Sequence, residues 1–374
     1  MSTVIFAGGG TGGHLYPALA LGAALQALDS SVRVHYVGAR RGVEARVLPE
    51  QGVEHTLLPI RGFQRGGLVQ NWRLLPAMIG TLFGLAWLFL RLRPSLVVGT
   101  GGYASGPAGM WAVLTAVPLA LQEQNSHAGF TTRLLSRHAS QVHLGFPEAI
   151  IGLKPGRNTE VLSLGNPIRP PETSLDRDEC RASLGLTHDA VVLLVVGGSQ
   201  GARAVNEALL GALEGVARGD LPPRPERLEV LWGTGATHIE WVQKRLAPLG
   251  LGWVKARGYI DDMSTALAAT DVAVSRAGAM ATAELLAWGR PMLLVPLPTA
   301  AADHQTRNAE ALETAGAAVM LRESDLTPER LWHDVLSLTA DHERRSAMED
   351  AARARAQPNA AREIAEHLHR LISR

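Results

Sequence analysis

The fold of this chain is decided by its first strand and turn, which read Val4-Ile5-Phe6-Ala7-Gly8-Gly9-Gly10-Thr11-Gly12-Gly13-His14. The four apolar residues predict a short buried strand, and the glycines predict a tight turn. Beyond the turn, leucines recur at helical spacing, at Leu15, Leu19, Leu25 and Leu28. A strand, a glycine-rich turn and a helix in this order are typical of an α/β domain with a parallel sheet.

Strand and helix patterns then alternate along the first half of the chain. Further short strands are predicted at residues 32–37, 96–98, 119–121 and 141–144. The stretch 165–171, Gly-Asn-Pro-Ile-Arg-Pro-Pro, carries three prolines, which fit neither a helix interior nor a central strand. We therefore predict a linker at 166–171, between an N-terminal domain at 1–165 and a C-terminal domain at 172–374.

The second half repeats the arrangement of the first. An apolar run at 191–196 enters the turn Gly197-Gly198-Ser199-Gln200-Gly201-Ala202-Arg203. Later strands are predicted at residues 230–232, 253–255, 272–274 and 292–295, with helices between them, including 279–288 and 303–315. The predicted fold class is α/β, with two doubly wound, Rossmann-like parallel-sheet domains. The last helix, from about residue 360, is expected to pack back on the first domain.

Composition excludes several classes of protein. The chain has 374 residues, 46% hydrophobic and 19% charged, which is a globular balance, and its net charge of +1 gives no indication of nucleic-acid binding. Residues 1–165 carry 13 Lys and Arg against seven Asp and Glu, so the first half is basic and the remainder is acidic. This charge difference could mean that the first half faces an anionic surface, or it could be a chance imbalance. A single cysteine, Cys180, excludes an intrachain disulfide. The N-terminus reads as a strand rather than a signal peptide.

An uncharged apolar segment at 74–90 stands apart from the α/β pattern. Its 17 residues lie near the lower limit for a membrane span, but a span would divide the first sheet between two sides of a membrane. We expect instead a helix that is partly buried and partly exposed, with a membrane-contacting patch at Ile79, Leu82, Phe83 and Trp87. Arginines and tryptophans surround the segment, at Arg61, Arg65, Arg73, Arg91, Arg93, Trp72 and Trp111. A long core helix is the alternative.

The first glycine turn satisfies the pattern G-x-G-x-x-G, which lets backbone N–H groups approach a phosphate. The pattern alone is weak, because a dinucleotide dehydrogenase would place an acid at the end of its second strand. Here that strand is followed by Arg40 and Arg41, which leaves an NADP site open. His14, at the start of the helix, is a candidate general base toward an acceptor hydroxyl, or a capping histidine.

Three further candidate ligand sites fall in the second half. Ser199 in the second glycine turn could donate to a phosphate, or the turn could be purely structural. Glu284 lies on the helix after the strand 272–274. It could bind ribose hydroxyls, or it could simply interact favourably with the positive end of the helix dipole. Asp303-His304-Gln305 suits sugar hydroxyls or plain helix capping. No H-E-x-x-H sequence and no Walker A sequence occurs, and no metal-ligand spacing surrounds Cys180, so neither a metal nor a cofactor is expected.

Taken together, the motifs resemble the MurG family of peptidoglycan N-acetylglucosaminyltransferases over roughly residues 4–320. The motifs that carry the resemblance appear in order at 9–14, 101–107 (Gly-Gly-Tyr-Ala-Ser-Gly-Pro), 123–125 (Glu-Gln-Asn), 165–169, 197–203, 258–263 (Gly-Tyr-Ile-Asp-Asp-Met), 275–284 and 303–309. One departure is Gln122, where family members often have His.

The resemblance implies a GT-B fold with the active site in a cleft between the domains. The implied reaction is transfer of GlcNAc from UDP-GlcNAc, with inversion, to the muramic 4-hydroxyl of lipid I, giving lipid II for peptidoglycan synthesis. It needs no metal, because helix dipoles and backbone N–H groups stabilise the leaving diphosphate. The implied location is peripheral, on the cytoplasmic face of the bacterial inner membrane. Other cell-wall synthesis proteins are the expected protein partners.

The resemblance also implies roles for single residues. His14 is the leading base and Glu123 the second candidate. The implied donor-binding residues are Thr11, Gly12, Gly13, Asn125, Arg169, Ser199, Tyr259, Ile260, Ala279, Met280, Ala281, Thr282, Ala283, Glu284, His304 and Gln305.

Three alternatives stay open on the sequence alone. The chain could be another GT-B enzyme that uses a UDP-sugar, such as a lipid or small-molecule glycosyltransferase or a UDP-GlcNAc epimerase. It could be an NADP-dependent oxidoreductase. It could also be a catalytically inactive membrane scaffold.

Overall fold

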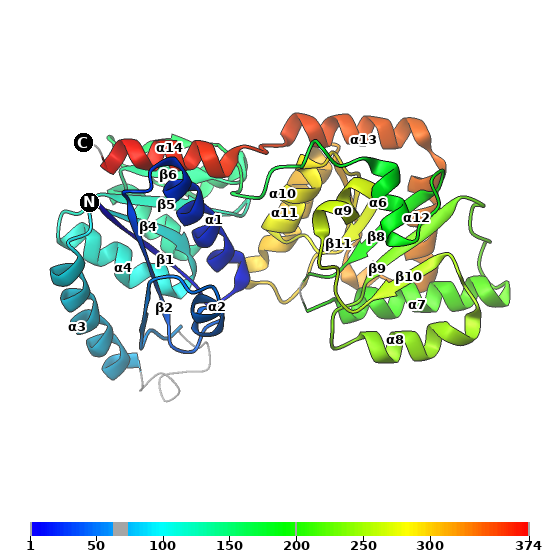
Figure 1. The fold of residues 1–374 in the computed structure, drawn as a ribbon, viewed down its shortest axis with the longest axis horizontal. Helices are drawn as coiled ribbons and strands as arrows, with labels where there is room; N and C mark the ends of the chain where they lie inside the picture. The colour runs from blue at the N-terminus through cyan, green and yellow to red at the C-terminus, as the bar shows by residue number, and fades with distance from the viewer. Residues whose placement is uncertain (1, 63–73, 199, 373–374) are drawn as a thin grey trace. The chain divides into compact units, whose positions relative to one another are not determined.

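The chain forms two compact units in the computed structural model, which describes residues 2–62, 74–198 and 200–372. Unit 1 comprises Met1–Arg169 and Pro358–Arg374, and unit 2 comprises Pro170–Gln357 (Figure 1). Each unit is built on one parallel sheet. Four residues named above lie outside the described residues: Arg65, Trp72, Arg73 and Ser199.

Unit 1 has a seven-stranded sheet in the order β3-β2-β1-β4-β5-β6-β7, and all of its strand pairs are parallel. The chain runs outward from β1 on one side and returns to β4 on the other, so the strand order reverses between these two strands. The strands are β1 (Thr3–Gly8), β2 (Arg33–Ala39), β3 (His55–Leu58), β4 (Leu96–Gly101), β5 (Leu119–Glu123), β6 (Gln141–Leu144) and β7 (Glu160–Leu162). The helices are α1 (Gly12–Leu28), α2 (Glu44–Glu50), α3 (Leu74–Leu92), α4 (Gly102–Leu114), α5 (Phe130–Leu135) and α14 (Ala360–Ile372).

Two hydrophobic cores cover the two faces of this sheet, because successive side chains of a strand point to opposite faces. Val4 and Phe6 of β1 pack with side chains of α1 and α14. Ile5 and Ala7 pack on the opposite face with side chains of α3, α4 and α5. Figure 1 shows α14 beside α1, so the last helix belongs to the core of unit 1.

Helix α3 is the one described helix that is long and apolar enough to cross a membrane by length and composition. It nevertheless lies between β3 and β4, which belong to one sheet. One helical stripe packs on that sheet through Ala77, Thr81, Leu85, Leu88, Phe89 and Leu92. The segment is therefore a partly buried helix of unit 1, and its remaining apolar face is exposed.

Unit 2 has a six-stranded parallel sheet in the order β10-β9-β8-β11-β12-β13, which reverses between β8 and β11. The strands are β8 (Val191–Val196), β9 (Leu228–Gly233), β10 (Val254–Arg257), β11 (Val272–Ser275), β12 (Met292–Leu294) and β13 (Ala318–Met320). The helices are α6 (Arg177–Leu184), α7 (Arg203–Arg218), α8 (Ile239–Leu246), α9 (Met263–Ala269), α10 (Ala279–Ala287), α11 (His304–Thr314), α12 (Pro328–Ala340) and α13 (His342–Arg355).

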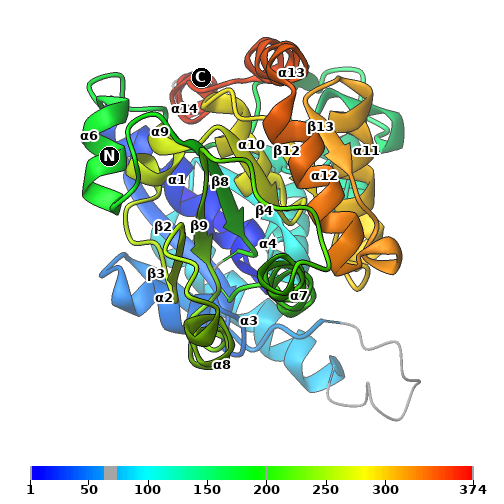
Figure 2. The ribbon, with the colours of Figure 1, turned by 90° about the vertical axis from the view of Figure 1, so that its right-hand side faces the viewer.

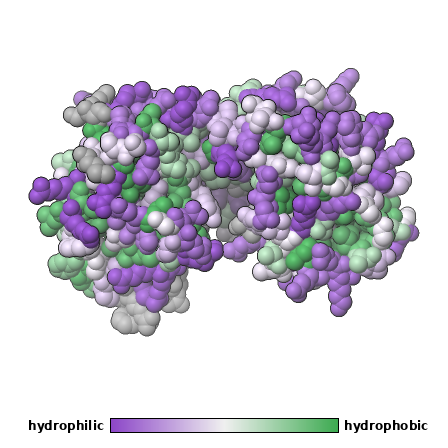
Figure 3. Space-filling model, in the orientation of Figure 1, coloured by the Kyte–Doolittle hydropathy of each residue, from purple (hydrophilic) through white to green (hydrophobic). Residues whose placement is uncertain are grey.

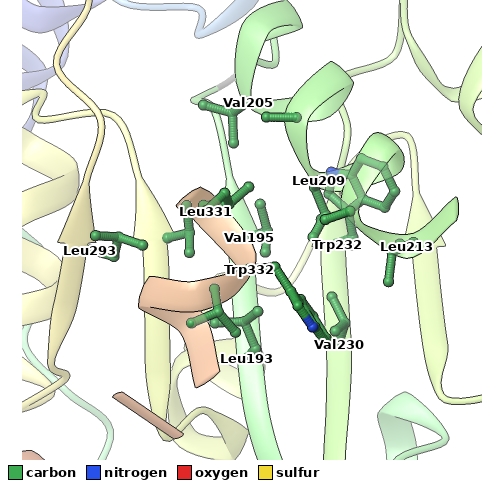
Figure 4. Packing of buried hydrophobic residues seen from close by; sticks show 14 of the residues in the cluster. Leu193, Val195, Val205, Leu209, Leu213, Val230, Trp232, Leu293, Leu331 and Trp332 are labelled. Atoms are coloured by element: carbon green, nitrogen blue, oxygen red, sulfur yellow. The ribbon is translucent and has the colours of Figure 1, made fainter. Parts of the chain in front are cut away.

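The core of unit 2 lies between this sheet and helices α7 and α12, which contact each other (Figure 2). Figure 4 shows Trp332 of α12 packed against Leu193 and Val195 of β8. Two tryptophans, Trp232 and Trp332, are fully buried there, and each indole N–H has an acceptor, Asn206 Oδ1 and the carbonyl of Pro222 respectively. This core holds the carboxyl ends of β8 and β11 in place.

The predicted fold class is confirmed, because both halves are doubly wound parallel sheets with helices on both faces. Three strands were not predicted: β3, β7 and β13. Each is three or four residues long and lies at an edge of its sheet. Edge strands of this length carry little apolar periodicity, so the sequence gives a weak signal for them.

Candidate functional site

A cavity of about 520 Å³ lies in unit 2 at the carboxyl ends of β8 and β11. This is the place where the strand order reverses, and ligands of open α/β sheets bind at such a position. The cavity is lined by Gly197, Gly198, Gly201, Ala202, Arg203, Ala204, Glu207, Ser275, Arg276, Gly278, Ala281, Leu297, Gln305 and Glu323.

Two helix N-termini point their first residues at this cavity. Helix α7 contributes Ala202, Arg203 and Ala204, and helix α10 contributes Gly278 and Ala281. Neither helix has an acidic residue in its first turn, and neither has a side-chain cap. The first N–H groups of a helix have no partner within it and carry the positive end of the helix dipole. The cavity is therefore suited to a negatively charged group such as a diphosphate.

The glycines of the second turn allow its backbone to approach neighbouring chain closely. Gly198 and Gly201 have φ of +86° and +77°. A Cβ added to Gly201 would lie 2.0 Å from the carbonyl oxygen of Thr234. Any other residue there would move the loop that leads into α7, so these glycines fix the cavity wall.

Arg276 and Gln305 hold the loop after β12 against the cavity. The Arg276 guanidinium donates to the carbonyls of Val295 and Pro296, at 3.1 and 3.2 Å, and pairs with Glu323 at 2.5 Å. Gln305 Oε1 accepts from the backbone N–H of Leu297 at 3.0 Å, and within the described part of the chain its amide N–H₂ group has no acceptor, so it can donate to a ligand. Two residues just before α11, Ala302 and Asp303, have φ of +53° and +55°, which is strained for residues other than glycine.

Glu284 lies on α10 and is mostly buried. Burial raises the pKa of its carboxyl group from 4.5 to about 7. The side chain makes no hydrogen bond or ion pair with the residues that the structure describes. A buried carboxyl group without a protein partner is suited to accept hydrogen bonds from ligand hydroxyls.

The structure places the other predicted donor-binding residues of unit 2 as follows. Tyr259 and Ile260 follow β10; the Tyr259 ring is exposed and Ile260 is buried. The Thr282 hydroxyl donates to the carbonyls of Gly278 and Ala279, so it is occupied within α10. His304 interacts through Nδ1 with the carbonyl of Ala301 at 2.7 Å and does not line the cavity. Ala279 is buried in α10, and Met280 and Ala283 are partly buried there.

In unit 1, the first glycine turn surrounds a carboxylate of the protein itself. Glu44 is fully buried and accepts hydrogen bonds from the backbone N–H groups of Gly10 and Ala39, both at 2.9 Å. A Cβ on Gly9, Gly38 or Gly42 would lie within 2.4 Å of Glu44 side-chain atoms. The expectation that this turn offers free N–H groups to a phosphate is therefore wrong at Gly10, because Glu44 already supplies the anion. Thr11 and Gly13 are exposed and Gly12 is partly exposed.

His14 lies against the turn that follows β4. A Cβ on Gly101 would lie 2.8 Å from His14 Nδ1, and a Cβ on Gly102 would lie 3.0 Å from its Cδ2. Both glycines have positive φ, +97° and +73°. The imidazole Nδ1 is 2.9 Å from Gln124 Oε1, and Nε2 has no partner among the described residues. A partly exposed imidazole with one nitrogen held and the other without a partner among the described residues suits a general base.

Glu123 is placed differently from His14. Its carboxylate is buried, and it accepts from the backbone N–H groups of Asn125 and Gly129 at 3.2 and 2.9 Å. It also accepts from the Asn125 side chain at 3.3 Å. Both oxygens thus hold the loop at 123–129, which makes Glu123 a structural acceptor in unit 1. Arg169, at the end of unit 1, is exposed.

Sequence reasoning missed two side chains that organise this region, Glu44 and Gln124. Glu44 lies five residues beyond the strand end at which an acid was sought, and its partners are backbone groups. Gln124 belongs to the motif at 123–125, in which the resemblance implies roles for Glu123 and Asn125 only. The identity of a polar residue does not indicate which hydrogen-bonding partner the folded chain places beside it.

The outer face of α3 is apolar and exposed. Its exposed side chains are Leu75, Met78, Ile79, Leu82, Phe83, Trp87 and Leu90. The Arg91 guanidinium lies 5.0 Å from the centre of the Trp87 ring. Figure 3 shows apolar groups among polar ones at the left edge of unit 1, where Figure 1 places α3. Large exposed apolar side chains gathered on one face of a helix mark an interaction site.

Comparison with known proteins gives one result for both units. The profile of the glycosyltransferase family 28 N-terminal domain matches residues 4–144, and that of its C-terminal domain matches residues 192–368. Relatives in Chlorobaculum parvum and Salinibacter ruber are 41% and 40% identical, over 97% and 99% of this chain and 97% of each relative. Both are named UDP-N-acetylglucosamine--N-acetylmuramyl-(pentapeptide) pyrophosphoryl-undecaprenol N-acetylglucosamine transferase.

Solved structures agree with the sequence relatives. The crystal structure of Acinetobacter baumannii MurG is similar with a TM-score of 0.76 and 28% identity, over 99% of this chain and 100% of that one. The calicheamicin glycosyltransferase CalG4 shares the fold, with a TM-score of 0.68 at 17% identity over 100% and 99% of the two chains. The fold is of the GT-B type. The chain belongs to glycosyltransferase family 28 and, within it, to the MurG family.

Proposed function

We propose that this enzyme transfers GlcNAc from UDP-GlcNAc to the muramic 4-hydroxyl of lipid I, with inversion, and so makes lipid II. The observation that carries the proposal is the unit 2 cavity, where the starts of α7 and α10 meet at the point of strand reversal. The names of relatives about 40% identical over nearly their whole length supply the donor and the acceptor.

Unit 2 binds the donor in this proposal. The first N–H groups of α7 and α10 hold the diphosphate, and Glu284 accepts from the ribose hydroxyls. Tyr259 stacks near the uracil, and the backbone of Ile260 reads its edge. Gln305 offers its amide N–H₂ group to the sugar. The predicted roles of Ser199, His304, Arg169 and the remaining residues of α10 rest on the family resemblance, as do those of Thr11, Gly12, Gly13 and Asn125.

Unit 1 supplies the base. As the acceptor oxygen forms its bond to the anomeric carbon of GlcNAc, the bond from that carbon to UDP breaks and UDP leaves with the electron pair. His14 Nε2 takes the proton of the attacking hydroxyl. Glu123 is the weaker candidate, because its oxygens already accept three hydrogen bonds. Independence from metal ions stays a prediction; helix N-termini offset the charge of the leaving group.

The exposed face of α3 accounts for contact with a lipid-linked acceptor. Phe83 and Trp87, with Ile79 and Leu82, enter the headgroup region, while the buried stripe keeps α3 on the sheet. The enzyme is then a peripheral protein of the cytoplasmic membrane face. Contact with other cell-wall synthesis proteins stays a prediction.

One incubation tests the reaction directly. The full chain is mixed with radiolabelled UDP-GlcNAc and a lipid I analogue, and the products are separated by chromatography. The expected product carries the label on the acceptor and appears with an equal amount of UDP. Label that stays in a nucleotide sugar of altered configuration would indicate an epimerase. Donor binding without product would indicate an inactive scaffold.

A further inference from the structure

Three buried side-chain amides form a row behind His14. Gln124 Oε1 lies 2.9 Å from His14 Nδ1, and Gln124 Nε2 donates to Gln122 Oε1. Gln122 Nε2 donates to Asn166 Oδ1 at 3.1 Å, and Asn166 Nδ2 donates to the backbone carbonyl of Gln124 at 3.0 Å. The three amide side chains are almost fully buried. The proposed function uses only His14 at the end of this row.

The orientation of each amide follows from neighbouring groups that can act only as hydrogen-bond acceptors. An amide oxygen and nitrogen are hard to tell apart by shape, but a backbone carbonyl can only accept. Asn166 must turn its nitrogen to the Gln124 carbonyl, so its oxygen faces Gln122. Gln122 therefore presents its nitrogen to Asn166 and its oxygen to Gln124.

Two backbone carbonyls fix the orientation of the Gln124 amide independently. Its Nε2 lies 2.8 Å from the carbonyl oxygen of Thr100 and 3.1 Å from that of Gln122. Two independent sets of acceptors thus require the same orientation. Turning the amide over would place its oxygen against both carbonyls and leave buried groups unsatisfied, at roughly 1–3 kcal/mol each. Gln124 can only offer an oxygen to His14.

We propose that Gln124 is a positioning residue that holds neutral His14 in the tautomer with its proton on Nδ1. An oxygen facing Nδ1 requires an N–H there, so the lone pair of neutral imidazole is on Nε2, which has no partner among the described residues. This inference rests on the proposed function, in which Nε2 takes the proton of the acceptor hydroxyl. Because the amide is uncharged, it accepts from neutral and protonated imidazole alike and takes no proton itself.

The backbone around His14 supports the same assignment. The Thr100 hydroxyl donates to the carbonyl of His14 at 2.8 Å, which fixes the start of α1. Gly101 and Gly102 lie against one side of the ring and leave no room for a Cβ. The Thr100–Gly102 turn therefore holds both the imidazole and the amide that orients it.

Nitrogen NMR on the full chain tests the proposal without relying on turnover. The protein is labelled with ¹⁵N-histidine, and His14→Gln identifies the His14 signals among the 13 histidines. Above the titration range of imidazole, Nδ1 should show the shift of a protonated nitrogen and Nε2 that of an unprotonated one. A wild-type spectrum with the proton on Nε2 would overturn the proposal, even if no variant folded.

Variants separate orientation from stability. Gln124→Met keeps the length of the side chain without an acceptor, so the His14 signals should move toward the Nε2–H tautomer. Turnover should fall about tenfold or more while UDP affinity is retained. Gln124→Glu keeps an oxygen facing Nδ1 and should restore the wild-type tautomer, although it should lower stability because its second oxygen faces the carbonyls of Thr100 and Gln122. Gln122→Met is the matched control, because Gln124 keeps both carbonyl partners and the tautomer should not change. A Gln124→Met spectrum identical to that of the wild type would contradict the proposal.

Failure of the proposed function would look different. If His14→Gln retained full transfer activity, His14 would not be the base, whatever its tautomer. An Nδ1–H signal together with loss of transfer in His14→Gln supports both.

Discussion

Glu44 binds the backbone N–H of Gly10 through its buried carboxylate, across 34 residues of sequence. The same carboxylate binds Ala39 N–H at the end of β2. This relationship explains the glycines around it, because Gly9, Gly38 and Gly42 leave the space that the carboxylate occupies. Burial and the nearby Glu44 charge also raise the pKa of Tyr103. The first glycine turn of the enzyme is thus shaped around an internal anion.

Glu44→Gln should destabilise unit 1, because an amide has one oxygen for two N–H donors. The N–H left facing the amide nitrogen loses its acceptor, and the free energy of unfolding should fall by about 1–3 kcal/mol. Urea unfolding followed by circular dichroism measures the change. Glu50→Gln at the exposed end of α2 is the control and should change stability by less than about 0.5 kcal/mol. Equal stability of both variants would show that Glu44 contributes nothing specific.

Glu284→Gln should stabilise the free enzyme at high pH. The folded-state pKa of Glu284, about 7, lies above the ordinary 4.5. The stability contributed by its protonated form is full below pH 4.5 and is lost as pH rises through 7. The variant cannot ionise, so at pH 8 it should exceed the wild type by roughly 2–3 kcal/mol, with a smaller gain at pH 5.5. Thermal unfolding at both pH values measures this, and a gain independent of pH would contradict it.

The same variant should weaken UDP binding, because ribose hydroxyls donate more strongly to a carboxylate than to an amide. The loss should be roughly tenfold to a hundredfold at pH 8. The loss should be smaller at pH 6, where the Glu284 carboxyl group is protonated in most wild-type molecules. Calorimetric titration with UDP at both pH values compares the two proteins, which cancels the ionisation of UDP itself. Unchanged affinity at pH 8 would remove Glu284 from the nucleotide site.

Arg276→Lys should weaken UDP binding without a change in charge. Two different guanidinium nitrogens of Arg276 reach the Val295 and Pro296 carbonyls and Glu323, and a lysine has one terminal nitrogen in their place. The loop after β12, which Gln305 also holds, therefore loses part of its support. We expect a loss of about tenfold in affinity. Arg322→Lys is the matched control, since Arg322 pairs with Glu310 on the surface. A similar effect of both substitutions would argue against a specific role for Arg276.

Phe83→Ser combined with Trp87→Ser should reduce binding to anionic lipid vesicles. These side chains are 75% and 54% exposed, so their loss removes apolar contact with lipid while the buried stripe of α3 stays intact. Binding should fall about tenfold or more. Leu28→Ser, at the exposed end of α1, should leave it unchanged. Equal sedimentation of all three proteins with vesicles would contradict the lipid-contact proposal.

The sequence predicted the elements that carry strong periodicity. Apolar runs such as 191–196 and the glycine turns after them located the central strands, and with them the carboxyl ends where the cavity lies. The edge strands β3 and β13 were not predicted, because they are short and β3 carries polar residues such as His55 and Thr56.

The candidate site was predicted less completely than the fold. Motif residues such as Gln305 and Gly201 line the cavity, but Glu207 and Glu323 reach it from helix positions that no pattern marks. The role of Gln124 depends on carbonyls of Thr100 and Gln122, and such backbone partners cannot be read from residue identities.

A crystal structure of the full chain with UDP tests the central claim most directly. The account predicts the diphosphate in the unit 2 cavity, with oxygens within hydrogen-bonding distance of backbone N–H groups at the starts of α7 and α10. The ribose should lie at Glu284. UDP bound away from these helix starts, with the cavity empty, would contradict the account.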